Sequence, residues 1–132
     1  MAIVPYAILR DRIRKSSFRS RFFLTEPERA YIAAKGFEVI HAQAVHILTE
    51  RIAQAVPYND GSQTPMRGHV VFKAQHATAC CCRSCLQKYH YIPKGRPLTE
   101  EEIQALAGLI VDYLREKAGD LSSFPVTGDL FS

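Results

Sequence analysis

The segment from Thr99 to Gly119 constrains the fold most, because it carries the complete signature of a long amphipathic helix. Thr99 and Glu102 have the spacing of a capping box, in which each side chain bonds to the backbone of the other. Gly119 is suited to end the helix. Its predicted core face consists of apolar residues at helical spacing, which are Ile103, Leu106, Ile110 and Leu114.

Two more helices are predicted in the first half of the chain. Thr25 and Glu28 have the spacing of a second capping box, and Gly36 is suited to end that helix. The following helix is expected over residues 38–56, with Pro57 at its end. Its broad apolar stripe consists of Ile40, Ala44, Ile47, Leu48, Ile52 and Ala55.

The middle of the chain has a different pattern. Residues 58–68 (YNDGSQTPMRG) form an irregular loop by composition, because they are rich in turn residues. The next run, HVVFKA, predicts the only strand, since Val70 and Val71 are β-branched and precede Phe72. A further helix is expected from residue 78 or 79 to about Tyr89. One strand cannot form a sheet. We therefore expect a mainly α fold, a small single-domain helical fold with an irregular loop and at most a short strand or hairpin.

Charge is distributed unevenly along the 132 residues. Residues 1–22 carry six basic residues against one acid, residues 59–98 also carry six against one, and residues 99–132 carry two against seven. We predict a basic amphipathic arm or helix over residues 1–16, a single helical domain over 17–118 and an extended tail over 119–132. The positive segments permit an anionic partner such as nucleic acid. Alternatively, the arm packs its apolar stripe on the body of the protein.

The sequence favours a cytoplasmic location. No apolar run approaches the length that spans a bilayer, so we expect no membrane partner. The first ten residues, MAIVPYAILR, have no basic residue ahead of their short apolar patch, which is unlike a signal peptide. In a reducing compartment, cysteines are metal ligands, redox groups or small buried side chains and seldom form disulfides.

The stretch from Gly68 to Gly95 contains all four cysteines and three of the five histidines. Cys82 and Cys85 have the two-residue separation that lets two thiolates bind one ion. Zinc accepts two thiolates and two imidazoles in a tetrahedron. The sequence therefore makes zinc the candidate cofactor, as a structural ion. Its candidate ligands are Cys82, Cys85, His90 and His76, with Cys81 as a substitute.

Two other interpretations of this stretch stay open. A strand followed by a CxxC pair at a helix start is typical of thioredoxin-like redox sites, although the chain lacks the surrounding βαβ pattern. Alternatively, the four cysteines fill core space as small apolar groups. The residues that we expect to line a binding site are Arg67, His69, His76 and Arg83.

Three classes of function are compatible with these patterns. The first is a small cytosolic binding or accessory domain whose Cys/His cluster holds zinc. The second is a metal-assisted hydrolase or nuclease, in which a carboxylate from residues 100–102 or another helix would serve as the base. The third is a nucleic-acid-binding module that uses the basic segments.

Four separated motifs resemble one family. They are FRSRF (18–22), NDGSQTPMRGH (59–69), QHATACCCRSCL (75–86) and HYIPKGRPLTEEE (90–102). Together they resemble the domain-of-unknown-function family 4186 over roughly residues 17–117. The resemblance implies a bacterial protein and carries over neither an activity nor a catalytic residue. Sequences of this kind have Thr at the position of Cys80 and Trp-His in place of Tyr89-His90, which implies that Cys80 is the cysteine least suited to be a ligand.

Overall fold

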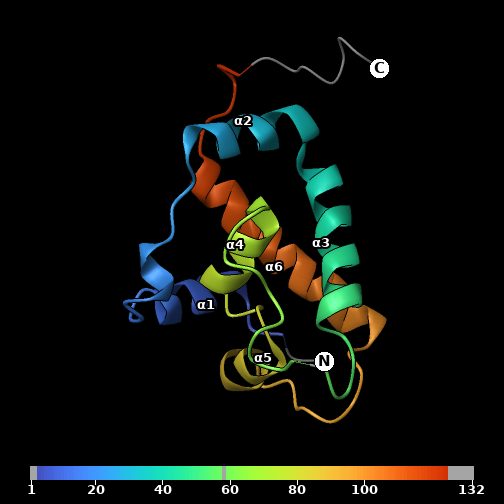
Figure 1. Cartoon of the computed structure of the whole chain (residues 1–132). Helices are drawn as coiled ribbons and strands as arrows, with labels where there is room; N and C mark the ends of the chain where they lie inside the picture. The colour runs from blue at the N-terminus through green and yellow to red at the C-terminus, as the bar shows by residue number, and fades with distance from the viewer. Residues whose placement is uncertain (1–2, 58, 125–132) are drawn as a thin grey trace.

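The computed structural model describes residues 3–57 and 59–124, and in this range it contains six α-helices, one 3-10 helix and no strand (Figure 1). The mainly α fold class is therefore confirmed. In chain order the elements are α1 (Tyr6–Ile13), η1 (Arg19–Arg21), α2 (Glu26–Lys35), α3 (Phe37–Arg51), α4 (Val70–Ala77), α5 (Arg83–His90) and α6 (Glu100–Ala118). None of these helices is long and apolar enough to cross a membrane.

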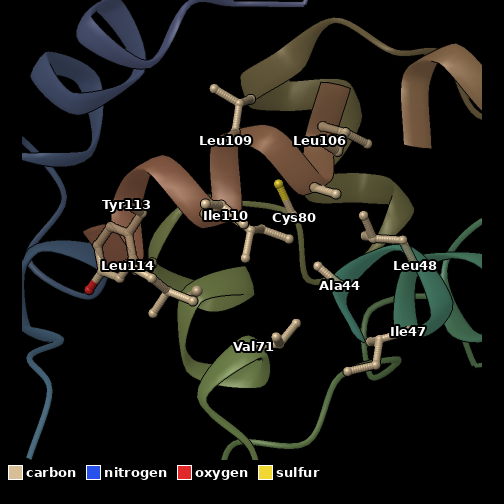
Figure 2. Close-up of a cluster of buried hydrophobic side chains, with 14 of the residues drawn as sticks. Ala44, Ile47, Leu48, Val71, Cys80, Leu106, Leu109, Ile110, Tyr113 and Leu114 are labelled. Carbon is tan, nitrogen blue, oxygen red and sulfur yellow. The ribbon is translucent and has the colours of Figure 1, made fainter. Parts of the chain in front are cut away.

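Helix α6 is the central element, and α3 and α4 pack against it (Figure 1). The four apolar residues predicted for its core face are all buried. Figure 2 shows Leu106 and Ile110 of α6 facing the same apolar cluster as Ala44 and Leu48 of α3. The sulfur of Cys80 projects into this cluster, so that cysteine belongs to the core. The predicted apolar stripes therefore meet across one core.

Both predicted capping boxes are present. Glu28 N–H donates to Thr25 Oγ1 over 3.3 Å, and Thr25 N–H donates to Glu28 Oε1 over 2.9 Å. The equivalent pair at α6 has distances of 3.0 and 2.9 Å between Thr99 and Glu102. Gly36, with φ 82°, ends α2 and immediately precedes α3. Each cap is worth about 1 kcal/mol and satisfies backbone N–H groups of the first turn with residues of the same segment.

Helix α1 packs its apolar side on the body. Leu9 and Ile13 are buried, and α1 contacts α6. Arg10 Nη1 lies 2.5 Å from Glu116 Oε2, and the Tyr6 hydroxyl donates to Glu116 Oε1 over 2.8 Å. The basic amino-terminal segment is thus partly neutralised by the acidic last helix.

The expectation of a strand over HVVFKA is wrong, because Val70–Ala77 forms α4. His69 caps this helix by accepting the Val71 N–H at its Nδ1 atom over 3.0 Å. Val70, Val71, Ala74 and Ala77 are all buried. That spacing is helical, and tertiary packing of this face overrides the β preference of the adjacent valines.

Two predicted helix boundaries are also wrong. Helix α5 begins at Arg83, since residues 78–82 form a connection in which Ala79 adopts a left-handed conformation with φ 62°. Helix α3 ends at Arg51, five residues before the predicted end. The predicted extended tail lies mostly outside the described residues, which end at Phe124.

Candidate metal centre

Three thiols converge where the connection after α4 meets the start of α5. The Sγ atoms of Cys81, Cys82 and Cys85 all lie within 4.8 Å of one another. The Cys81 and Cys85 sulfurs are 3.5 Å apart. Cys81 and Cys82 are buried, and Cys85 is half-buried. This group could hold a metal ion, because thiolates are preferred ligands of zinc and of softer cations.

The local backbone explains why these sulfurs meet. Cys82 is the N-cap of α5 and has an extended backbone, and its Sγ accepts the N–H of Cys85 over 3.4 Å. A cap residue and the residue three positions later necessarily share the first turn of the helix. An N–H donor and the positive end of a helix both favour a thiolate over a thiol. The CxxC pair is therefore held by helix capping, and Cys81 joins it from the preceding connection.

The irregular loop over residues 59–69 holds this connection in place. Thr64 Oγ1 donates to the Cys81 carbonyl over 2.7 Å. Gln63 Oε1 accepts the N–H of Arg83 over 3.0 Å, and its Nε2 donates to the Arg51 carbonyl over 2.7 Å. Both loop side chains are buried. Residues from the loop motif thus fix the backbone on both sides of Cys82.

Arg83, predicted from the sequence as a binding residue, lies inside the protein with no exposed surface. Its Nη2 donates to the carbonyls of Pro93 and Arg96, each over 2.9 Å. Its Nη1 donates to the carbonyl of Gln54 over 2.8 Å and contacts that of Ala53 at 3.4 Å. Burial lowers the pKa of Arg83. The guanidinium therefore ties the start of α5 to two loops.

Arg19 is a residue of the site that sequence reasoning missed. Its Nη2 donates to Cys85 Sγ over 3.1 Å, and its Nη1 donates to the His76 carbonyl over 2.6 Å. Its guanidinium carbon lies 4.7 Å from the ring centroid of Tyr89. Burial by itself would lower the pKa of Arg19, but hydrogen bonds with Tyr89 and Cys85 outweigh it and raise this pKa. In the sequence, Arg19 stood out only as part of the motif FRSRF. No local pattern indicates that it contacts a cysteine 66 residues away.

The three thiols also affect one another's ionisation. The hydrogen bond with Cys82 raises the pKa of Cys81, and the hydrogen bond with Cys81 raises the pKa of Cys85. For Cys82, the bond with Cys81 opposes the shift, but the bond with Cys85 and burial outweigh it and raise its pKa. Three adjacent thiolates repel one another, so a cation is required to keep all three ionised together.

The two candidate histidine ligands lie outside the three-cysteine group. His76 Nε2 is 3.1 Å from the Thr64 carbonyl and 3.2 Å from the Pro65 carbonyl. Its ring stacks on Phe22 with a centroid separation of 6.3 Å. This imidazole therefore bridges the irregular loop and the segment around η1.

His90 is buried at the end of α5. Its Nε2 is 2.8 Å from the Thr78 carbonyl and 3.8 Å from Cys80 Sγ. Burial lowers the pKa of His90, and it raises the pKa of Cys80 to about 12. This pair therefore belongs to the core, apart from the other three cysteines.

The remaining two predicted binding residues lie at the other end of α4. His69, its N-cap, lines two surface hollows of about 470 and 650 Å³, and burial lowers its pKa. Arg67 is exposed in the loop just before it. Since His76 lies in the last turn of α4, the structure separates His69 from His76 by the length of this helix.

The fold and the site together define an all-α domain, over the described residues, with a three-cysteine group that could hold a metal ion. The chain belongs to the family described as Domain of unknown function (DUF4186), whose model matches residues 7–115. The family resemblance of the four motifs is thereby confirmed. No solved structure matches the chain. The family description assigns no activity.

Proposed function

We propose that this protein is a small cytosolic metal-binding domain in which the thiolates of Cys81, Cys82 and Cys85 hold one zinc ion. The convergence of the three sulfurs within 4.8 Å supports this proposal most directly. Tetrahedral zinc with Zn–S bonds of about 2.3 Å places its sulfur ligands roughly 3.8 Å apart. The cysteines therefore already have nearly the spacing that the ion requires.

Charge balance supports the same assignment. Three thiolates and one Zn²⁺ carry a net charge of −1, which would be costly to bury without a partner. Arg19 places a positive guanidinium 3.1 Å from Cys85 Sγ, so the site with Arg19 is neutral overall. A hydrogen bond to a metal-bound sulfur also orients that ligand. We therefore assign Arg19 the role of a positioning residue for Cys85.

The proposed role of the ion is structural. Its ligands join the connection after α4 to the first turn of α5, and Arg19 extends this link to η1. The imidazoles of His76 and His90 already contact backbone carbonyls, so we assign only the three thiolates as ligands. The proposal thus replaces the two histidines with Cys81.

The alternative of a metal-assisted hydrolase is less well supported by the geometry. Its base was expected among residues 100–102 or on another helix, and of the first group Glu102 is held by Arg96. Arg96 donates to its two carboxylate oxygens over 2.8 and 2.7 Å, and these bonds lower the pKa of Glu102 to about 2. The three-cysteine group itself contains no carboxylate among the described residues. A binding role is therefore the proposal that we favour.

Elemental analysis and metal titration of the purified protein test the proposal. We expect about one zinc per chain and, after removal with a chelator, restoration by added zinc. Cobalt substitution should produce intense sulfur-to-metal charge-transfer absorption, because thiolates are the ligands. A protein that purifies without zinc and does not bind it in competition with a chromophoric chelator contradicts the proposal.

Cysteine variants test which thiols are the ligands. Cys82→Ser should reduce zinc affinity at least about tenfold, since a hydroxyl is a far weaker ligand than a thiolate. Cys80→Ala is the matched control, because this cysteine lies in the core and should leave the stoichiometry unchanged. Equal losses in the two variants would contradict the assigned ligand set. Circular dichroism of each variant separates lost binding from lost folding.

A further inference from the structure

Aromatic rings and guanidinium groups alternate across one surface of the protein. Successive distances from guanidinium carbon to ring centroid are 5.1, 5.7, 4.7, 5.8 and 4.9 Å. The residues, in this order, are Tyr91, Arg12, Tyr89, Arg19, Phe18 and Arg21. We call this set the arginine–aromatic surface. It draws on α1, on the segment around η1 and on the end of α5, so only the folded chain assembles it.

This assembly joins the two basic segments of the sequence. Arg12 Nη1 donates to the Tyr89 carbonyl over 2.8 Å, which attaches α1 to α5. Lys88 adds a further cation, with its Nζ 5.9 Å from the Tyr89 ring centroid. In Figure 1, α1 and α5 both lie toward the end of the molecule opposite α2. Lys88, from the second basic segment, is therefore brought close to arginines of the first.

The cations of this surface are not neutralised by carboxylates. Among the described residues, Arg10, Lys73 and Arg96 each form a salt bridge with a glutamate. None of the salt bridges in that part of the chain includes a cation of the arginine–aromatic surface or its neighbour Lys88. Arg21 and Lys88 are also exposed to solvent. Arg21 and Lys88 therefore present positive charge that is available to an anionic partner.

Two rings of the surface are exposed to solvent. Tyr91 is 67 % exposed and Phe18 is 36 % exposed. Tyr91 also has a left-handed backbone with φ 60°, a conformation that bulky residues seldom adopt. Exposed rings beside unpaired cations are the combination that binds single strands, because bases stack on rings while phosphates pair with arginine and lysine.

We propose that the arginine–aromatic surface binds single-stranded nucleic acid. Bases would stack on Tyr91 and Phe18, and Arg21 and Lys88 would contact phosphates. A duplex hides the faces of its bases, so the rings give a preference for single strands that charge alone does not. This proposal does not depend on the zinc proposal, since the exposed groups that it uses are not metal ligands.

Fluorescence anisotropy with labelled oligo-dT and oligo-U of about 15 nucleotides tests the proposal on the full chain. We expect affinity to fall at least about tenfold between roughly 50 and 200 mM salt, because several phosphates are neutralised. Arg21→Glu should weaken binding about tenfold under low salt. Lys35→Glu changes the charge equally on α2 and should have little effect. Equal effects of the two variants, or no binding at low salt, would overturn the proposal.

The rings have their own test. Tyr91→Asn removes the ring and keeps a residue that tolerates the left-handed conformation. Phe18→Leu removes a ring and keeps apolar bulk. Each should weaken single-strand binding about fivefold or more. If neither variant changes binding, or a duplex of the same length binds as tightly as the single strand, the surface attracts anions by charge alone. Binding to phosphatidylserine vesicles without binding to oligonucleotides would also overturn the proposal.

Discussion

Two regions of the molecule are stabilised in different ways. In the helical frame, which consists of α2, α3 and α6, buried apolar side chains such as Leu48 and Ile110 pack against each other (Figure 2). In the cysteine corner, which consists of residues 59–69 and 78–96 on either side of α4, buried polar side chains such as Gln63 and Arg83 bond to the backbone. Apolar packing is not directional, whereas a buried hydrogen bond leaves a costly unpaired group when one partner is lost.

The difference predicts that the two regions respond to different substitutions. The frame should depend on the volume of its side chains, because cavities lose both burial and van der Waals contact. The corner should depend on particular donors and acceptors and on the proposed metal ion. Four substitutions, in decreasing order of expected effect, test this contrast.

The largest effect is expected from Ile110→Ala in the frame. Ile110 has no exposed surface and lies at the centre of the apolar cluster, so the free energy of unfolding should fall by about 4 kcal/mol. Urea denaturation followed by circular dichroism measures this loss. Ile8→Ala is the control, because Ile8 is 55 % exposed and should change stability by less than about 0.5 kcal/mol. A loss below about 1 kcal/mol at Ile110 would show that this cluster is not the main source of stability.

Arg83→Met tests the corner. Methionine keeps much of the volume but leaves three carbonyls without the donors that now lie within 2.9 Å, and each loss costs about 1 kcal/mol. Stability should therefore fall by about 3 kcal/mol. The exposed Arg14→Met change is the control and should be nearly neutral. Similar stabilities for the two variants would mean that the corner does not depend on these bonds.

Glu102 connects the two regions, since it caps α6 in the frame and accepts from Arg96 in the corner. Its pKa is lowered from 4.5 to about 2, first of all by the bonds from Arg96. A depressed carboxyl pKa stabilises the fold above the ordinary pKa, and this contribution disappears as pH falls from about 5 toward 2.

The magnitude at neutral pH should be about 2 kcal/mol, after allowance for the partial exposure of Arg96. Glu102→Gln should remove this contribution and flatten the pH dependence of unfolding between roughly pH 5 and 2. Urea denaturation at several pH values measures both effects. If the free energy of unfolding of Glu102→Gln depends on pH as steeply as that of the unaltered protein, other carboxylates cause the acid sensitivity.

The smallest effect, and the only stabilising one, is expected from Ala79→Gly. Ala79 has φ 62° in the connection between α4 and α5, where a glycine avoids the steric cost of its methyl group. Loss of the buried methyl offsets part of this gain. The free energy of unfolding, measured by urea denaturation, should therefore rise by about 0.5 kcal/mol. A decrease in the free energy of unfolding would indicate that the buried packing of the Ala79 methyl group contributes more than its steric cost.

The frame could be predicted from the sequence because its signals are local. Both capping boxes involve residues three positions apart, and the core stripe of α6 follows from helical spacing alone. The corner could be predicted only in outline. Val70 and Val71 suggested a strand because β-branched residues favour strands. In the structure they lie on the buried face of a helix, and the packing of that face decides. The start of α5 was misplaced because a cysteine is an uncommon helix cap.

By itself, the sequence determined the class of fold, the family and the stretch in which the cysteines could act. It did so because capping, hydrophobic spacing and the CxxC separation depend on residues that are close neighbours along the chain. Only the tertiary structure decided that Cys81 joins Cys82 and Cys85 while both candidate histidines turn to backbone carbonyls. It also brought Arg19 to Cys85 and Arg12 to the end of α5. These contacts join residues far apart in the sequence, and no local pattern encodes which distant partner a side chain will meet.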